Sequence, residues 1–175
     1  MKITKPLLGL VLCGLCLSPL GNAYSKDKLS IQAEVPFGRP ANVPGNIRAE
    51  CDLNKKMHDL LEAEFERNDV EVVTVDDISK ANGKALEVTI EHLSGFGGGG
   101  WSGPKHMEMS GKLVQNGKKI GSFTAGEKSI GGGFSGFVFK GTCNIFHIIE
   151  EALAEDIVFW YLNDHEMGAR LGSGG

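Results

Sequence analysis

The sequence predicts an α/β (α+β) fold, a two-layer sandwich in which a mixed sheet of about five strands carries two helices on one face. Three observations lead to this prediction. Some segments show the apolar period of two that is typical of strands, and two others show the helical period. These segments follow one another as strand, helix, several strands and helix. Asn116-Gly117 separates two extended runs, which is the strongest short signal for a β-hairpin.

The first strand is expected over residues 29–35, where apolar and polar residues alternate. Residues 36–45 carry three prolines and two glycines, so this segment is predicted to be a connection. A helix is then expected from Asn46, a suitable N-cap, to Asn68-Asp69. Its apolar stripe has spacings of three and four and comprises Ala49, Leu53, Met57, Leu60, Leu61 and Phe65.

Further strands are expected where β-branched or alternating residues recur. Residues 70–75 form a short run rich in β-branched residues, and residues 76–83 form a polar turn region. In residues 86–90 apolar and polar residues alternate. Residues 106–115 and 118–128 form the hairpin around Asn116-Gly117. The first strand, helix and second strand are expected to make a right-handed crossover, and the later strands an antiparallel meander.

The last helix follows the second glycine-rich segment, residues 130–141, and Thr142 is its expected N-cap. Its apolar face comprises Ile145, Ile148, Ile149, Ala152, Leu153, Ile157 and Trp160. The tail, residues 163–175, is polar and glycine-rich and is expected to be disordered.

Residues 1–23 show the pattern of a cleavable signal peptide. Lys2 and Lys5 precede an uncharged apolar run, and Gly21-Asn22-Ala23 places small residues before a cleavage position after Ala23. An uncleaved anchor helix is the alternative, but the apolar run is short for a bilayer span. Cleavage leaves a single domain over residues 24–162 and the tail over residues 163–175.

Charge and cysteine content restrict the partners and the compartment. Cleavage removes Lys2 and Lys5, so a net charge of −4 becomes −6. An acidic chain without a basic run argues against nucleic acid and against anionic membrane surfaces as partners. Only Cys51 and Cys143 remain after cleavage, and in an exported chain they are predicted to form a disulfide. Metal ligation or a free catalytic thiol is the alternative, but no Cys and His cluster at short spacing supports it.

Glycine is concentrated in residues 95–136, which hold 14 of the 25 glycines. Both glycine-rich segments contain G-x-G-x-x-G, beginning at Gly95 and at Gly131. A dinucleotide fingerprint opens a helix directly within a parallel unit, whereas the first segment leads into a hairpin. A nucleotide cofactor is therefore not predicted.

No catalytic residue, metal or cofactor is predicted, and the protein is not expected to be an enzyme. Ser102 and Ser135 are each one residue short of the G-x-S-x-G nucleophile elbow. His92 and His106 flank the first glycine-rich segment and could meet across a hairpin, but lone histidines are more often surface residues. The paired carboxylates Asp76-Asp77 and Glu150-Glu151 are interpreted as turn chemistry and a solvated helix face.

The meander places both glycine-rich segments and the start of the last helix at one end of the sheet. If the first strand runs parallel to the third, the start of the first helix joins them, and Cys51 and Cys143 can meet. Aromatic residues on such loops can mark a recognition surface, or they can fold back over the end of the sheet. The predicted partner-binding residues are Phe96, Trp101, Lys105, Phe134, Phe137 and Lys140.

The run ALEVTIEHLSGFGGGGWSGP, the NGK hairpin, the second glycine-rich segment and the final helix together resemble a family of small exported bacterial proteins of unknown function. The order of elements over about residues 28–162 is similar in plan to the α/β domain at the N-terminus of the periplasmic TolB protein. Many relatives are lipoproteins, whereas this chain lacks a lipobox. The resemblance implies an accessory role in the cell envelope without an activity to carry over.

The sequence thus predicts a non-enzymatic, exported binding or assembly module that is periplasmic or secreted, has a protein partner and has no integral membrane segment after cleavage. The alternative is a periplasmic or secreted inhibitor or immunity protein that binds a basic enzyme or toxin, which its acidic charge would suit. An enzyme comes third.

Overall fold

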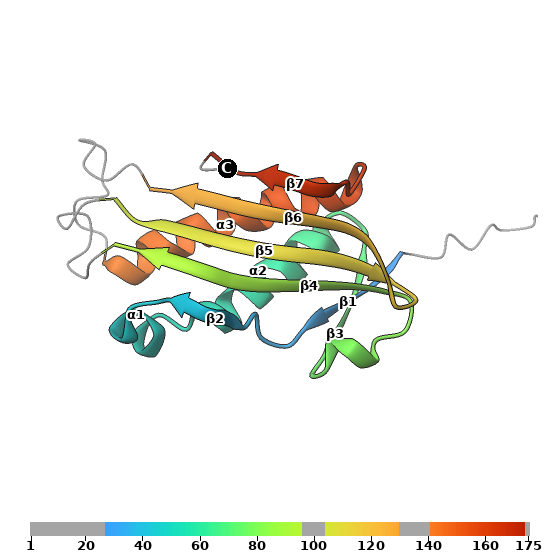
Figure 1. The fold of residues 1–175 in the computed structure, drawn as a ribbon, viewed down its shortest axis with the longest axis horizontal. Helices are drawn as coiled ribbons and strands as arrows, with labels where there is room; N and C mark the ends of the chain where they lie inside the picture. The colour runs from blue at the N-terminus through green and yellow to red at the C-terminus, as the bar shows by residue number, and fades with distance from the viewer. Residues whose placement is uncertain (1–26, 96–103, 130–140, 174–175) are drawn as a thin grey trace, which may run out of the picture.

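The computed structural model describes residues 27–95, 104–129 and 141–173. Within these residues it has a mixed seven-stranded sheet. The two long helices, α2 (Leu53–Arg67) and α3 (Thr142–Leu162), lie on one face of the sheet, as Figure 1 shows. The predicted two-layer α+β class is therefore confirmed, although the sheet has more strands than the five expected.

The centre of the sheet is the predicted antiparallel meander of β4 (Lys84–Ser94), β5 (His106–Gln115) and β6 (Lys118–Lys128). Asn116 and Gly117 connect β5 to β6 with φ angles of 52° and 79°. A type I′ turn requires positive φ at both of its central residues, so the structure confirms the turn that this dipeptide predicted.

Parallel strands flank the meander on one side. β1 (Lys28–Gln32) lies between β3 (Glu71–Val75) and β4 and runs parallel to both. The chain leaves β1 and returns to β3 through α2, as the crossover prediction required. The polar turn region between β3 and β4 contains the short 3-10 helix η1 (Ile78–Lys80).

The first predicted helix is broken in two, α1 (Gly45–Glu50) and α2. Cys51 ends α1, and Asp52 adopts a left-handed conformation with φ of 48°. A left-handed residue cannot continue a right-handed helix, and Asp tolerates this conformation better than most residues. Asn46 lies inside α1 and is not an N-cap, and α3 begins at Thr142 with Gly141 before it.

The prediction that residues 36–45 only connect elements was wrong, because β2 (Phe37–Asn42) forms there. β2 pairs with β4 in parallel, with Phe37 opposite Ile90, and Ile90 N–H donates to the carbonyl of Pro36. Each end of β4 is thus covered on the same side, one by β1 and the other by β2. Proline has no N–H to donate. An edge strand tolerates it at positions that face away from the neighbouring strand, because no hydrogen bond within the sheet is lost there.

The tail was expected to be disordered, and this prediction was also wrong. β7 (Met167–Leu171) runs parallel to β6 and extends the sheet. Gly121 of β6 allows the close approach of the chain after α3, since a Cβ at Gly121 would lie 2.3 Å from the carbonyl oxygen of His165. The indole Nε1 of Trp160 also donates to the carbonyl of Glu166, at 3.2 Å, just before β7 begins.

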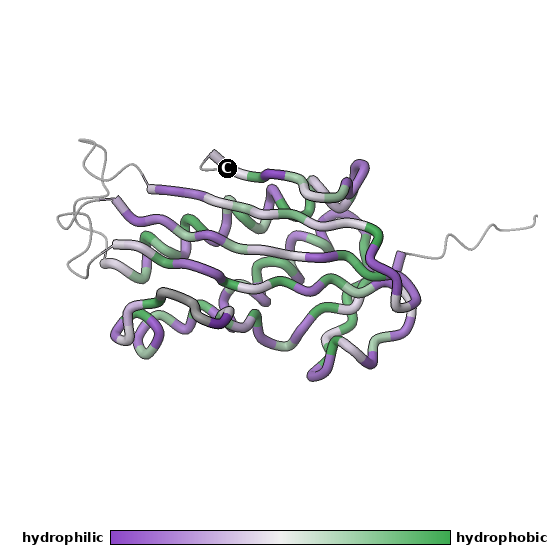
Figure 2. Tube along the Cα trace, in the orientation of Figure 1, coloured by the Kyte–Doolittle hydropathy of each residue, from purple (hydrophilic) through white to green (hydrophobic). Residues whose placement is uncertain are grey.

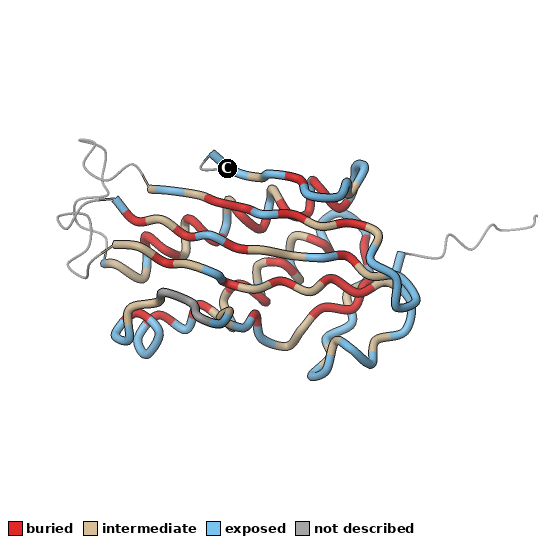
Figure 3. The backbone as a smooth tube through the Cα atoms, in the orientation of Figure 1, coloured by how far each residue is buried: buried red, intermediate tan, exposed pale blue. Residues whose placement is uncertain are grey.

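One hydrophobic core fills the space between the sheet and the helices. Along the central strands apolar residues alternate with polar ones in Figure 2, and buried residues alternate with accessible ones in Figure 3. Val88 and Ile90 of β4 are buried, as are Phe65 of α2 and Phe146 of α3. None of the helices in the described ranges combines the length and apolarity needed to cross a bilayer.

Candidate functional site

One end of the sheet, which we call the loop end, gathers the segments that flank both glycine-rich loops. Ser94 at the close of β4 pairs with His106 of β5, and His106 pairs with Lys128 near the close of β6. In Figure 1 these ends lie together with α1 and the start of α3. The predicted convergence of the flanking elements is therefore present, while residues 96–103 and 130–140 themselves lie outside the described residues.

A disulfide between Cys51 and Cys143 fixes the helices to one another at the loop end, with Cα atoms 5.0 Å apart. Cys51 sits at the junction of α1 and α2, and Cys143 is the second residue of α3. The parallel pairing of β1 with β4 brings these helix starts to the same end of the sheet, as the sequence argument required. The disulfide thus joins the α1–α2 junction covalently to the start of α3 at the loop end.

Lys105 is the one predicted partner-binding residue within the described ranges, and the structure buries it. Its side chain is 0% exposed, and burial lowers the pKa of its ammonium group below the ordinary value. Its backbone exchanges hydrogen bonds with Ser129, and Gly95 packs against its side chain, where a Cβ would lie 2.3 Å from Lys105 Cδ. Lys105 therefore belongs to the base of the loop end. Phe96, Trp101, Phe134, Phe137 and Lys140 lie outside the described residues.

Glu150 is a buried carboxylic acid that the sequence interpretation missed. Glu150-Glu151 was interpreted as a solvated helix face, but only Glu151 is exposed, whereas Glu150 is 0% exposed. Glu150 Oε2 lies 2.8 Å from His147 Nδ1, and Glu150 Oε1 has no hydrogen-bond partner among the described residues. Burial raises the pKa of Glu150 to about 7. The hydrogen bond and the charge of His147 and the charge of Lys56 lower this pKa, but by less than burial raises it.

This carboxyl group gives the protein a proton-binding site that titrates near neutral pH. We expect the free energy of unfolding to fall by about 3 kcal/mol as the pH rises from about 4.5, the ordinary pKa, to above about 7. The sign follows because, between these values, native Glu150 holds a proton that the unfolded chain has released. Urea denaturation at several pH values measures this slope.

Glu150→Gln should remove most of that slope, because the amide cannot ionise. Glu151→Gln is the matched control, since Glu151 is the exposed neighbour and its removal should leave the slope in place. Equal slopes in the wild type and Glu150→Gln would show that Glu150 does not hold its proton in the native state.

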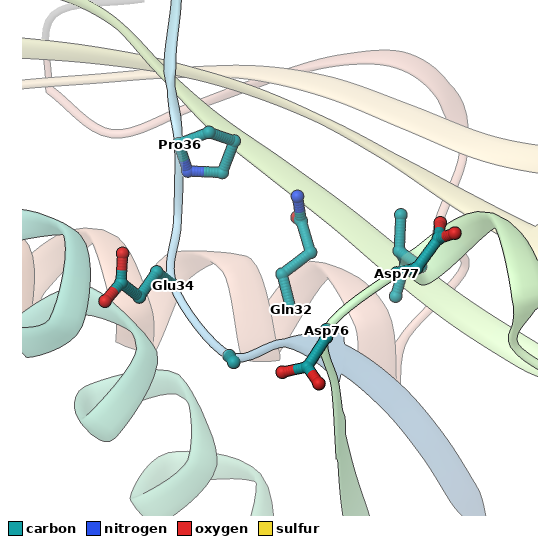
Figure 4. Close-up of a pocket in the computed structure, with 7 residues that line it drawn as sticks. Gln32, Glu34, Pro36, Asp76 and Asp77 are labelled. Carbon is teal, nitrogen blue, oxygen red and sulfur yellow. The ribbon is translucent and has the colours of Figure 1, made fainter.

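A separate hollow of about 540 Å³ lies beside the connection from β1 to β2 and the end of β3. Figure 4 shows that the carboxylates of Glu34, Asp76 and Asp77 are spread around it and do not converge. Asp77 accepts hydrogen bonds from Ser79 N–H and Ser79 Oγ, and Gln32 Oε1 accepts one from Val88 N–H. Asp77 thus stabilises a turn, and Gln32 supports the pairing of β1 with β4.

The two histidines considered as metal ligands have other neighbours. His106 Nδ1 lies 2.9 Å from the carbonyl oxygen of Glu127, and its Nε2 lies 2.9 Å from Glu108 Oε1. His92 lies opposite Glu108 across the β4–β5 pair. In the part of the chain that the structure describes, no three His, Cys, Asp or Glu side chains are grouped so that they could hold a metal ion.

Comparison with known proteins gives information on the fold only. No protein-family model and no curated protein sequence matches this chain. Among solved structures, protein XCC0632 of Xanthomonas campestris, from family DUF330, is similar with a TM-score of 0.52 and 12% identity, covering 81% of this chain and 88% of that one.

Two further structures have lower scores. The PelC dodecamer of Paraburkholderia phytofirmans has a TM-score of 0.43 and 11% identity, covering 74% of this chain and 86% of that one. Lipoprotein GNA1162 of Neisseria meningitidis has a TM-score of 0.44 and 11% identity, covering 78% and 99%. The similarity in plan to TolB stays a prediction. The match to XCC0632 supports the fold of this chain alone.

Proposed function

We propose that this chain is a non-enzymatic accessory protein of the bacterial cell envelope that binds a protein partner through the loop end. The observation that carries the proposal is the convergence of the elements flanking both glycine-rich segments at one disulfide-anchored end of the sheet. Binding residues often lie on the segments that connect the helices and strands of a scaffold. Export is supported by the signal pattern of residues 1–23 and by the disulfide, which persists in oxidising compartments.

Affinity capture from the envelope fraction tests this function. A mature protein that begins after Ala23 should be recovered from the periplasm with components of envelope machinery. Recovery of a single basic enzyme or toxin in a tight complex would favour the inhibitor function instead, which the net negative charge also suits.

Trp101→Ala tests whether the loop end is the contact surface. A large ring between glycines is expected to adapt to a partner and to contribute little to the core, so the denaturation midpoint should barely change. Binding of the captured partner should weaken at least tenfold, because aromatic anchors dominate such interfaces. A Trp101→Ala protein that is strongly destabilised, or that binds normally, would contradict the proposed surface.

A further inference from the structure

A groove runs between α2 and α3 on the surface of the helix layer. It consists of two adjoining hollows of about 250 and 360 Å³. Glu64 of α2 and Glu155 of α3 line both hollows, so the two lie side by side along the helix pair. The groove lies along the helices, and none of its lining residues belongs to the strands that end at the loop end.

The charge of the groove is negative and largely uncompensated. Glu64 is engaged by Arg67 and by Asn68, whereas Glu151, Glu155 and Asp156 form no ion pair among the described residues. Burial raises the pKa of Asp156, and the negative charges of Glu127 and Glu155 raise it further. A cationic side chain placed here would therefore relieve repulsion between carboxylates that exists in the free protein.

The apolar part of the groove is near the end of α3. The Phe159 side chain is 70% exposed and that of Leu162 is 45% exposed, although most large apolar residues of α3 are buried. Glu151, Glu155, Phe159 and Leu162 follow one another at spacings of four, four and three, so they form one stripe along the helix. This stripe is acidic at one end, apolar at the other, and about 16 Å long.

We propose that this groove docks a basic, amphipathic helix of a protein partner. About three helical turns match the length of the stripe. Lys or Arg side chains of the partner would lie against Glu151 and Glu155, and its apolar side chains would pack on Phe159 and Leu162. An anionic membrane does not fit, because the carboxylates would be repelled by its headgroups. The inference goes beyond the loop end and adds a second interaction surface with a partner of defined chemistry.

A synthetic helix-forming peptide of Lys and Leu, about 14 residues long, is a suitable probe. In titrations of the ¹⁵N-labelled mature protein followed by NMR, shift changes should be concentrated in residues 60–68 and 151–162. Binding should weaken as salt increases. A peptide in which Glu replaces every Lys should not bind.

Charge-matched variants distinguish binding of the peptide in the groove from attraction by the net charge of the protein. Glu151→Lys with Glu155→Lys should weaken peptide binding at least tenfold, and Phe159→Ser should weaken it severalfold. Asp59→Lys with Glu66→Lys changes the net charge by the same amount at exposed α2 positions outside the groove lining, and it should alter binding less than twofold. Thermal denaturation verifies that all variants are folded.

Equal weakening by both charge-reversal pairs would overturn the proposal, because it would show attraction by net charge alone. So would shift changes outside the groove, or binding to phosphatidylglycerol vesicles in place of the peptide. Trp101→Ala should leave peptide binding unchanged, so the failure of this proposal and the failure of the loop-end function are distinguishable.

Discussion

Removal of the Cys51–Cys143 disulfide should lower the free energy of unfolding by about 4 to 5 kcal/mol. The cysteines are 92 residues apart in sequence, and in the chain-entropy model a bridge that closes so long a loop strongly restricts the unfolded chain. The double variant Cys51→Ala with Cys143→Ala should therefore denature at a much lower concentration of guanidinium chloride than the oxidised wild type.

The reduced wild type is the internal control for that comparison. Its free energy of unfolding should agree with that of the double variant within about 1 kcal/mol, and reductant should have no effect on the variant itself. Alkylation of the purified, denatured wild type without reductant should find no free thiol. Two reactive thiols per chain under these conditions would show that the bridge does not form in the purified mature protein.

Trp160→Ala should lower the free energy of unfolding by about 3 to 5 kcal/mol. Trp160 is 5% exposed, its ring centroid lies 4.9 Å from that of Phe123, and its Nε1 donates to the carbonyl of Glu166. The truncation removes core packing on β6 and also the hydrogen bond that leads the chain into β7. Denaturant unfolding followed by circular dichroism measures the loss.

The adjacent residue provides a control on the same helical turn. Phe159 is 70% exposed, so Phe159→Ala should cost well under about 1 kcal/mol. If the two substitutions destabilise the protein equally, then Phe159 packs against the core in solution. That result would also remove the apolar part of the groove between α2 and α3.

Local patterns predicted the elements whose determinants are local. Asn116-Gly117 specifies its own turn, and the alternation in residues 86–90 specifies a half-buried strand wherever it lies in the sheet. The disulfide followed from counting the cysteines and from placing two helix starts at one end of the sheet. The turn and the strand depended on local sequence alone, whereas the disulfide, which joins residues 92 apart, could be predicted because two cysteines allow one pairing.

The errors arose where a distant segment decides the outcome. The prolines and glycines of residues 36–45 predicted a connection. Part of this segment forms a strand because it pairs with the free edge of β4. The tail becomes β7 because Gly121, far away in the sequence, leaves room for it. Glu150 is a charged residue, a type that is usually exposed, and no local pattern distinguishes it from the exposed Glu151.

The lengths of the strands also bear on how exposed the edges of the sheet are to pairing with another chain. β4, β5 and β6 have 10 or 11 residues each and lie inside the sheet, whereas β3 and β7 have five each and form its two outer limits. β2, which covers the remaining part of β4, is short and contains Pro40. Short edge strands with proline or charged residues such as Glu71 and Arg170 are poor templates for pairing with another chain. The long strands, whose backbone groups could otherwise pair with another chain, are thereby shielded from such pairing.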